Sequence, residues 1–206
     1  MDEARAPASA VVLAGGRGKR LGGDKAAVEL APGETLLQRA LTLVAPLSDD
    51  VIVVRRPDQR LATPGARIVT DQPPFEGPLA GILAGLEAAR HEWSLVVACD
   101  MPFLSAPVVR YLMALRPGHD IVVPRLEVGM EPLHALYHRR AAAAIRGALE
   151  RGEHRLISFY RALRVRAVTS DELAPFDREG RTFFNINTPE DLQQARAWLK
   201  AEEPSP

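Results

Sequence analysis

The chain has 206 residues, and its 26 basic and 26 acidic side chains give a formal net charge of zero, so we expect neither nucleic acid nor an anionic membrane as a partner. A single cysteine excludes an internal disulfide, no apolar run approaches the roughly 18 residues of a transmembrane helix, and the first residues lack the pattern of a signal peptide. We therefore expect one cytoplasmic domain over residues 1–206 that acts on a small substrate, with a disordered tail at 201–206.

Short β-branched runs alternate along the chain with longer helical patterns, which is typical of βαβ units around a mostly parallel sheet. The apolar runs predict strands over residues 9–14, 51–54, 66–70, 95–99, 121–124, 133–137, 165–168 and 182–186. Apolar side chains at helical spacing predict helices over residues 35–47, 79–90, 107–115, 139–151, 155–160 and 189–201. Thr188 followed by Pro189 predicts the start of the last helix, with the threonine as its N-cap. The predicted fold class is α/β.

The first predicted strand stops at Gly15 and Gly16 and opens into a loop with several cations. The cations are Arg17, Lys19, Arg20 and Lys25. Glycine lets backbone amides converge on oxyanions while the cations neutralise the charge, so the loop predicts a site for a polyphosphate such as a nucleoside triphosphate. The spacing fits neither a P-loop nor the dinucleotide fingerprint, which would need a third glycine or alanine at Leu21. A glycine-rich surface loop with solvated charges is the alternative.

Two carboxylates follow predicted strands. Asp100 comes after the apolar run 95–99, which places it at the crevice where open α/β sheets bind ligands. Mg²⁺ prefers oxygen and typically uses one or two carboxylates plus substrate phosphates, so Asp100 is the candidate metal ligand. The alternative for Asp100 is a helix N-cap or an ordinary loop aspartate. Asp71 ends the third strand at the same edge, where it could bind metal, sugar or base.

Small residues and amides mark two further segments. Gly77 and Gly81 at the start of the second helix allow close approach either to a ligand or to the sheet. Asn185 and Asn187 stand at alternate positions of a predicted strand, so both amides should face one side, toward a polyoxygenated substrate or a metal-bound water. The alternative is a strand-to-helix turn with capping amides.

The remaining candidates among reactive or metal-binding residue types, two histidines and the cysteine, are expected to have structural roles. His134 and His138 share a face, but no third ligand stands at a zinc-like spacing, which favours structural histidines. Cys99 closes an apolar strand without an identifiable histidine partner, so we expect it to be buried and inert.

With these motifs in order, the chain resembles the molybdenum cofactor guanylyltransferases, within the nucleotidyltransferases that have a Rossmann-like sheet. The matching stretches are residues 13–16 with Arg20, then 22–25, Asp71, 77–81, 99–102 and 185–190. The resemblance implies a three-layer fold with a mostly parallel central sheet. It also implies Mg²⁺-dependent transfer of GMP from GTP to the phosphate of molybdopterin (the molybdenum cofactor), with release of pyrophosphate. Molybdoenzyme apoproteins or their chaperones are possible further partners.

The resemblance also assigns roles to individual residues. The implied GTP contacts are Leu13, Ala14, Gly15, Gly16, Lys25, Asp71 and Asp100, with the metal on Asp100. Asp100, Lys25 and Arg20 are the expected catalytic residues. Arg155, Asn185 and Asn187 are expected to bind the pterin acceptor.

The chain departs from the family at two places. It has Val54 followed by Arg55 and Arg56 where the family often has an asparagine, so that nucleotide contact is not carried over. Gly18 stands where the family usually has a small or basic residue, a difference expected to change little. The alternatives are a cytidylyl, sugar-phosphate or phospholactate nucleotidyltransferase, or a GTP-binding regulator without turnover.

Overall fold

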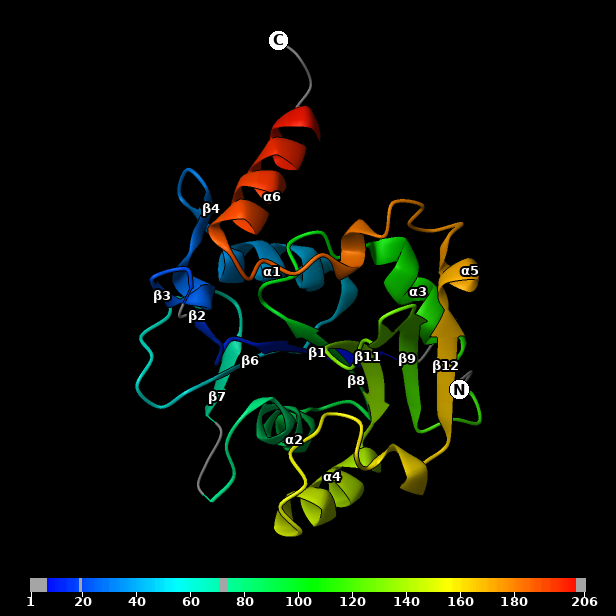
Figure 1. The fold of residues 1–206 in the computed structure, drawn as a ribbon. Helices are drawn as coiled ribbons and strands as arrows, with labels where there is room; N and C mark the ends of the chain where they lie inside the picture. Colours follow the sequence, from blue (N-terminus) through cyan, green and yellow to red (C-terminus); the bar gives the residue numbers. More distant parts are fainter. Residues whose placement is uncertain (1–6, 19, 71–73, 203–206) are drawn as a thin grey trace.

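The computed structural model describes residues 7–18, 20–70 and 74–202, so Lys19 and Asp71 lie outside the described residues. Its centre is an eight-stranded sheet of order β10-β9-β11-β8-β1-β6-β7, with β12 paired to β9 (Figure 1). The strands are β1 (Ala8–Leu13), β6 (Val51–Arg55), β7 (Arg67–Thr70), β8 (Trp93–Ala98), β9 (Ile121–Leu126), β10 (Gly129–Met130), β11 (His134–His138) and β12 (Val165–Thr169). The pairs β6–β7, β1–β6, β1–β8 and β9–β12 are parallel, whereas β11 and β10 run antiparallel to their neighbours.

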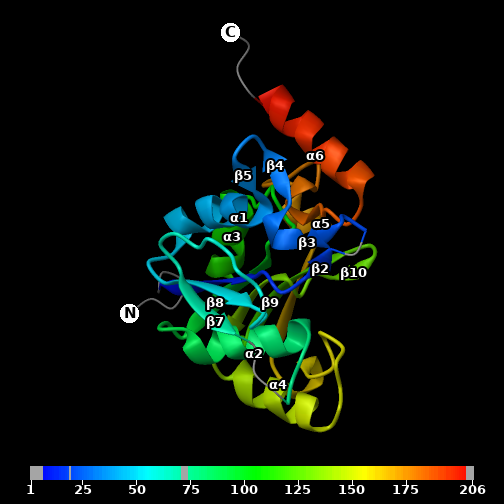
Figure 2. The ribbon, with the colours of Figure 1, turned by 90° about the vertical axis from the view of Figure 1, so that its left-hand side faces the viewer.

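Helices cover both faces of this sheet and give three layers. Helices α1 (Leu36–Val44) and α3 (Ala106–Ala114) lie on one face, and α2 (Pro78–Ala88) and α4 (Ala141–Glu150) lie on the other (Figures 1 and 2). Successive residues of β1 serve the two layers, because Val12 packs in the α1/α3 core and Val11 in the α2/α4 core. The predicted three-layer α/β fold with a mostly parallel sheet is confirmed.

Close packing between α2 and the sheet explains the glycines of that helix. A Cβ atom on Gly85 would lie 2.3 Å from Cγ1 of Val11, and one on Gly81 would lie 3.4 Å from Cδ2 of Leu13. Gly77 precedes the helix with φ of 91°, a conformation that favours glycine. Between the two interpretations of this segment, the contacts at Gly81 favour approach to the sheet.

Two predicted elements are wrong. Residues 182–186 form no strand: a short 3₁₀ helix, η5 (Arg181–Phe183), leads into an irregular segment. The apolar alternation there has another cause, because Phe183 packs against His134 and Phe184 against Trp198. Residues 155–160 form turns followed by η4 (Tyr160–Ala162) and no α-helix.

The segment 155–160 has a physical reason to stay irregular. Its aromatic residues dock on the sheet, where the hydroxyl groups of Tyr160 and Tyr137 lie 3.0 Å apart and Phe159 is buried. A helix of six residues is also too short to be stable through its own backbone hydrogen bonds.

The structure adds elements that the apolar pattern does not mark. Two polar hairpins follow β1, and a short helix precedes the C-terminal segment. The hairpins are β2 (Arg17–Gly18) with β3 (Gly23–Asp24) and β4 (Glu29–Ala31) with β5 (Glu34–Thr35), the 3₁₀ helix η2 (Lys25–Ala27) lies between them, and the short helix is α5 (Ser170–Leu173). The last residues of the helix predicted over 35–47 form a separate 3₁₀ helix, η3 (Ala45–Leu47). The last helix, α6 (Pro189–Glu202), extends one residue beyond the predicted range 189–201, into the segment 201–206 that the sequence analysis expects to be a tail. Among the described residues, no helix is long and apolar enough to cross a membrane.

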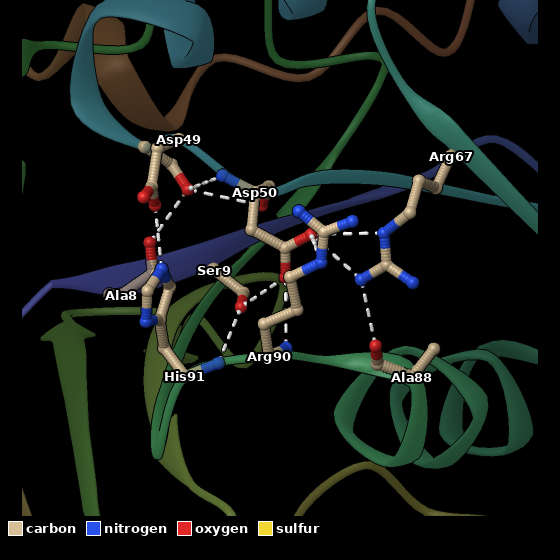
Figure 3. Close-up of polar contacts among 9 residues, drawn as sticks. Ala8, Ser9, Asp49, Asp50, Arg67, Ala88, Arg90 and His91 are labelled. Atoms are coloured by element: carbon tan, nitrogen blue, oxygen red, sulfur yellow. Dashed lines mark hydrogen bonds and ion pairs between the residues drawn. The ribbon is translucent and has the colours of Figure 1, made fainter.

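A buried carboxylate joins the strand beginnings at the amino edge of the sheet. Asp50 is 2% exposed and accepts hydrogen bonds from Oγ of Ser9 (2.6 Å), the amide of Arg90 (2.9 Å) and Nη2 of Arg67 (2.7 Å) (Figure 3). Burial alone would raise the pKa of Asp50, but these hydrogen bonds outweigh it and hold the pKa below its usual value. This cluster supports the fold at the edge opposite to the candidate site.

Candidate active site

The candidate site lies where the connections reverse direction around β1. The chain runs from β1 to β6 and β7 on one side, and β8 pairs with the other side of β1. Open α/β sheets bind ligands at such a point, beyond the carboxyl ends of the strands. The glycine-rich loop leaves β1 at this edge, and Asp100 follows β8 there. The amide of Cys99 donates to the carbonyl oxygen of Leu13 over 3.1 Å, which holds the two strand ends together.

Two side chains from the segment after β6 hold the carbonyl groups of the glycine-rich loop. Nε2 of Gln59 donates to the carbonyl oxygen of Ala14 (3.0 Å), and Nη1 of Arg56 donates to that of Gly15 (2.6 Å). Nη2 of Arg56 also donates to Oδ1 of Asp24 (2.6 Å), on the far arm of the loop. Arg56 and Gln59 therefore fix both the conformation of the loop and the direction of its peptide groups.

The amide groups of the loop are left available for a ligand. Within the described part of the chain, the N–H groups of Gly15 and Gly16 have no hydrogen-bond acceptor, and Gly16 is exposed. Free amides at a strand end, with cations nearby, are the elements of a phosphate cradle. The structure thus supports a ligand-binding loop more than a loop with only solvated charges.

The β2–β3 hairpin depends on glycine at two positions. Gly22 adopts φ of 80° in the turn, where the amide of Leu21 donates to the carbonyl oxygen of Gly18 (2.9 Å). A Cβ atom on Gly18 would lie 2.5 Å from the carbonyl oxygen of Gly23 and 3.0 Å from Cγ of Lys25. The expectation that the residue type at Gly18 changes little is wrong for this chain, because a side chain there would displace backbone and Lys25.

Lys25 is the centre of the site. Its Nζ lies 2.5 Å from Oδ2 of Asp100 and 2.6 Å from Oδ1 of Asn187. The side chains of Lys25 and Asp100 are 15% and 14% exposed, so the charge pair is largely withdrawn from water. The structure therefore brings together three residues that the sequence analysis singled out, across separations of 75 and 162 positions.

Backbone contacts fix Asp100 in place. Its carbonyl oxygen accepts from the amide of Ile186 (3.0 Å), and the carbonyl oxygen of Pro102 accepts from Nε of Arg39 (3.2 Å). Asp100 is not a helix N-cap, because α3 begins at residue 106 with Ser105 as its cap. The structure therefore excludes the helix N-cap as the role of Asp100.

The C-terminal segment carries Asn187 to the site without a strand. Asp191 accepts from the amides of Asn187 and Thr188 (2.8 Å each), and the amide of Asp191 donates to Oγ1 of Thr188 (3.2 Å). The hydrogen bond from the Asn187 amide is the main cause that lowers the pKa of Asp191. Thr188 is thus confirmed as the N-terminal cap of α6. Asn185 makes a different contact, with Nδ2 donating to the carbonyl oxygen of Phe183 (3.2 Å), and the strand on which the two amides were predicted to share one face is absent.

Helix α6 is held against the first part of the chain by aromatic and polar contacts. Trp198 packs on Phe184 and Phe103 with ring centroids 4.8 and 5.4 Å away. Nη2 of Arg196 donates to the carbonyl oxygen of Glu29 (2.7 Å), which joins α6 to β4; the two elements lie side by side in Figures 1 and 2. These contacts maintain the distance between the C-terminal segment and the glycine-rich loop.

Comparison with known proteins agrees with this arrangement. A family model described as the MobA-like NTP transferase domain matches residues 10–167. A relative from Desulfosudis oleivorans, named molybdenum cofactor guanylyltransferase, is 37% identical over 192 residues, covering 93% of this chain and 95% of the relative. A relative of the same name from Pseudomonas putida is 37% identical, covering 94% of this chain and all of the relative. The chain belongs to the molybdenum cofactor guanylyltransferase family.

Solved structures place the fold of this guanylyltransferase-family chain in a wider group. Molybdopterin-guanine dinucleotide biosynthesis protein A from Archaeoglobus fulgidus gives a TM-score of 0.82 at 30% identity, covering 94% of this chain and 99% of that one. The 2-C-methyl-D-erythritol 4-phosphate cytidylyltransferase of Thermus thermophilus gives 0.72 at 20% identity, covering 94% and 99%, and so shares the fold. The predicted family and fold are therefore confirmed.

Two described site residues predicted from the guanylyltransferase resemblance, Arg20 and Arg155, take no part in the hydrogen bonds of the Lys25 cluster. Arg20 is exposed in the turn between β2 and β3, and Arg155 is exposed in the loop after α4. Among the described residues, neither has a hydrogen bond or ion pair with Lys25, Asp100 or Asn187. Asp71 falls outside the described residues, so its predicted contact remains a prediction.

The predicted structural residues are buried. Burial raises the pKa of the Cys99 thiol well above its usual value and lowers that of His134 from 6.5 to about 4. His134 contacts Phe183 and His138 contacts Trp93, ring to ring. Among the described residues, no group of three or more His, Cys, Asp or Glu side chains is arranged to hold a metal ion.

Sequence reasoning missed Arg56 and Gln59. The sequence marks Val54 to Arg56 as a departure from the family and residues 56–65 as a loop, and it predicts no role for Arg56 or Gln59. These two polar residues follow a strand that ends at the ligand edge, and that position was the available signal. The loop groups that they hold, the carbonyl oxygens of Ala14 and Gly15, belong to the backbone and have no signature in the sequence.

Proposed function

We propose that this chain transfers GMP from GTP to the terminal phosphate of molybdopterin, forming the guanine dinucleotide of the cofactor and releasing pyrophosphate. The observation that carries the proposal is the convergence of Lys25, Asp100 and the free loop amides at the carboxyl edge of the sheet. It is supported by full-length relatives named molybdenum cofactor guanylyltransferase. We propose the cytoplasm as the compartment.

The reaction needs no general base from the protein. A phosphate monoester has a second pKa of about 6, so the acceptor is largely dianionic at neutral pH. One of its oxygens attacks the α-phosphorus of GTP, a new P–O bond forms, and the bond from the α-phosphorus to the bridging oxygen of the pyrophosphate breaks. The protein then contributes positioning and charge neutralisation.

This chain's residues divide that work. We propose that the amides of Gly15 and Gly16 bind the β and γ phosphates, with Leu13 and Ala14 forming the rest of the loop. Lys25, already directed into the site, neutralises charge on the phosphoryl group, and the exposed Arg20 joins it when substrate binds. Asp71 is proposed as a further nucleotide contact.

Asp100 fits a magnesium ion of the kind that phosphoryl-transfer sites use. Such an ion takes one or two carboxylates and completes its coordination with phosphates and water. Oδ2 of Asp100 accepts from Lys25, and among the described residues Oδ1 has no hydrogen-bond partner. When bound, Mg²⁺ would neutralise charge on the triphosphate. Arg155, Asn185 and Asn187 are proposed for the acceptor side.

The test is a screen of GTP, CTP, ATP and UTP with Mg²⁺ and molybdopterin, with released pyrophosphate as the readout. We expect pyrophosphate with GTP and a guanine dinucleotide product by mass spectrometry. Pyrophosphate release with CTP and with none of the other nucleotides would show that the donor base is cytosine and not guanine. Tight GTP binding without pyrophosphate from molybdopterin, a sugar phosphate or phospholactate would indicate a regulator and contradict the proposal.

A further inference from the structure

Asn187 makes a contact that its proposed role on the acceptor side does not require. Its Oδ1 lies 2.6 Å from Nζ of Lys25. An ammonium group can only donate, so the side-chain oxygen must face Lys25, and the NH₂ group must point away from it. Asn187 is exposed, so this NH₂ group reaches the solvent side of the cluster.

The backbone on both sides of this amide is immobilised. The amide of Ile186 donates to the carbonyl oxygen of Asp100 (3.0 Å), and Ile186 itself is fully buried. The amide of Asn187 donates to Asp191 (2.8 Å) at the start of α6. The side chain of Asn187 therefore extends from a fixed point and can hold Lys25 in one direction.

Capping of α6 does not account for the Asn187 side chain. Thr188 and Asp191 already satisfy the start of that helix through their own side chains. The neighbouring Asn185 shows the contrast, because its amide turns back to the carbonyl oxygen of Phe183. Only one asparagine of the pair is directed at the charged cluster.

We infer that Asn187 is a positioning residue for Lys25, so that its effect on the nucleotide passes through the lysine. The inference rests on the proposed function of the site. Lys25 has two partners, Asp100 and Asn187. When the carboxylate of Asp100 takes another partner, Oδ1 of Asn187 still holds the ammonium group beside the loop. The NH₂ group remains available to the acceptor, so one side chain joins the two substrate sites.

A double-mutant cycle tests this coupling. The proteins are wild type, Lys25→Ala, Asn187→Ala and the double variant, with GTP and Mg²⁺ binding measured by calorimetry. Gln194→Ala, on the exposed side of α6, is the matched control. Asn187→Ala removes a hydrogen bond to a charged group, and water replaces part of its free energy. We therefore expect about tenfold weaker GTP binding in this variant. In the Lys25→Ala background the same change should cost less than about twofold, because the group it positions is gone.

The outcomes separate the inference from the proposed function. Equal weakening by Asn187→Ala in both backgrounds would overturn the inference, as would weakening of guanosine binding to the same extent as GTP. If wild type binds another nucleoside triphosphate in place of GTP, the proposed donor is wrong, and the cycle is run with that nucleotide. If wild type binds no nucleoside triphosphate, both the proposed function and the inference are overturned.

Discussion

Protonation of His134 should make the stability of the protein fall between about pH 6.5 and about pH 4. The ring is fully buried, and neither nitrogen has a hydrogen-bond partner among the described residues. Burial lowers its pKa from 6.5 to about 4. The unfolded chain therefore binds a proton at higher pH than the folded protein. Stability falls as the pH drops from about 6.5 to about 4 and levels off below, a loss of about 3 kcal/mol.

The assay is urea unfolding of wild type, His134→Leu and the control His154→Gln between about pH 7 and about pH 4.5. Leucine has a similar volume and no group to protonate, and His154 is exposed. The wild-type free energy of unfolding should fall relative to His134→Leu by about 2–3 kcal/mol over this range, since a pKa unit is worth about 1.4 kcal/mol. Burial raises the pKa of Glu131, which also makes stability depend on pH. This contribution is the same in both proteins and cancels when wild type is compared with His134→Leu. Parallel pH curves for wild type and His134→Leu would refute the reasoning.

Three further predictions concern the site and its support. Asp100→Ala should fold normally and lose about two orders of magnitude in metal-dependent turnover, because a preorganised charge is removed; near-normal pyrophosphate release would exclude Asp100 from the mechanism. Lys25→Ala should weaken GTP binding more than guanosine binding in calorimetry, since guanosine has no phosphate, and equal weakening would instead assign Lys25 to the fold or the base pocket. Gly85→Ala should destabilise the protein by about 1–3 kcal/mol in urea unfolding, because its Cβ would collide with Val11. Gly147→Ala, whose Cβ would meet only the flexible end of Arg151, is the control and should be neutral or stabilising; equal effects would contradict the packing argument.

The sheet could be predicted because each central strand is apolar on both faces. Runs such as residues 95–99 have no other stable place in a protein of this size, and their ends locate Asp100 and the glycine-rich loop without further information. The last helix was also predictable, because Thr188 and Pro189 act locally.

The rest depends on contacts between distant segments. Phe183 and Phe184 belong to an apolar run that predicts a strand, but their rings contact His134 and Trp198, and the segment does not join the sheet. The partnership of Lys25 with Asn187 spans 162 positions and involves two polar side chains, so no pattern in the sequence reports it. The short helix α5 has a local signal in the sequence, the capping pair of Thr169 and Glu172. A helix of four residues is too short to show apolar periodicity, so a search for that periodicity does not find it.

The distance along the chain between Lys25 and Asn187 also sets an order of events during synthesis. The last strand of the sheet, β12, ends at residue 169, whereas Asn187 and the helix that holds it come later. A chain emerging from the ribosome therefore has all the described strands of the central sheet before it has Asn187, the second partner of Lys25. A nascent chain can complete this sheet while Lys25 is still paired with Asp100 alone, and the Lys25 cluster is fully assembled only after Asn187 and α6 have followed.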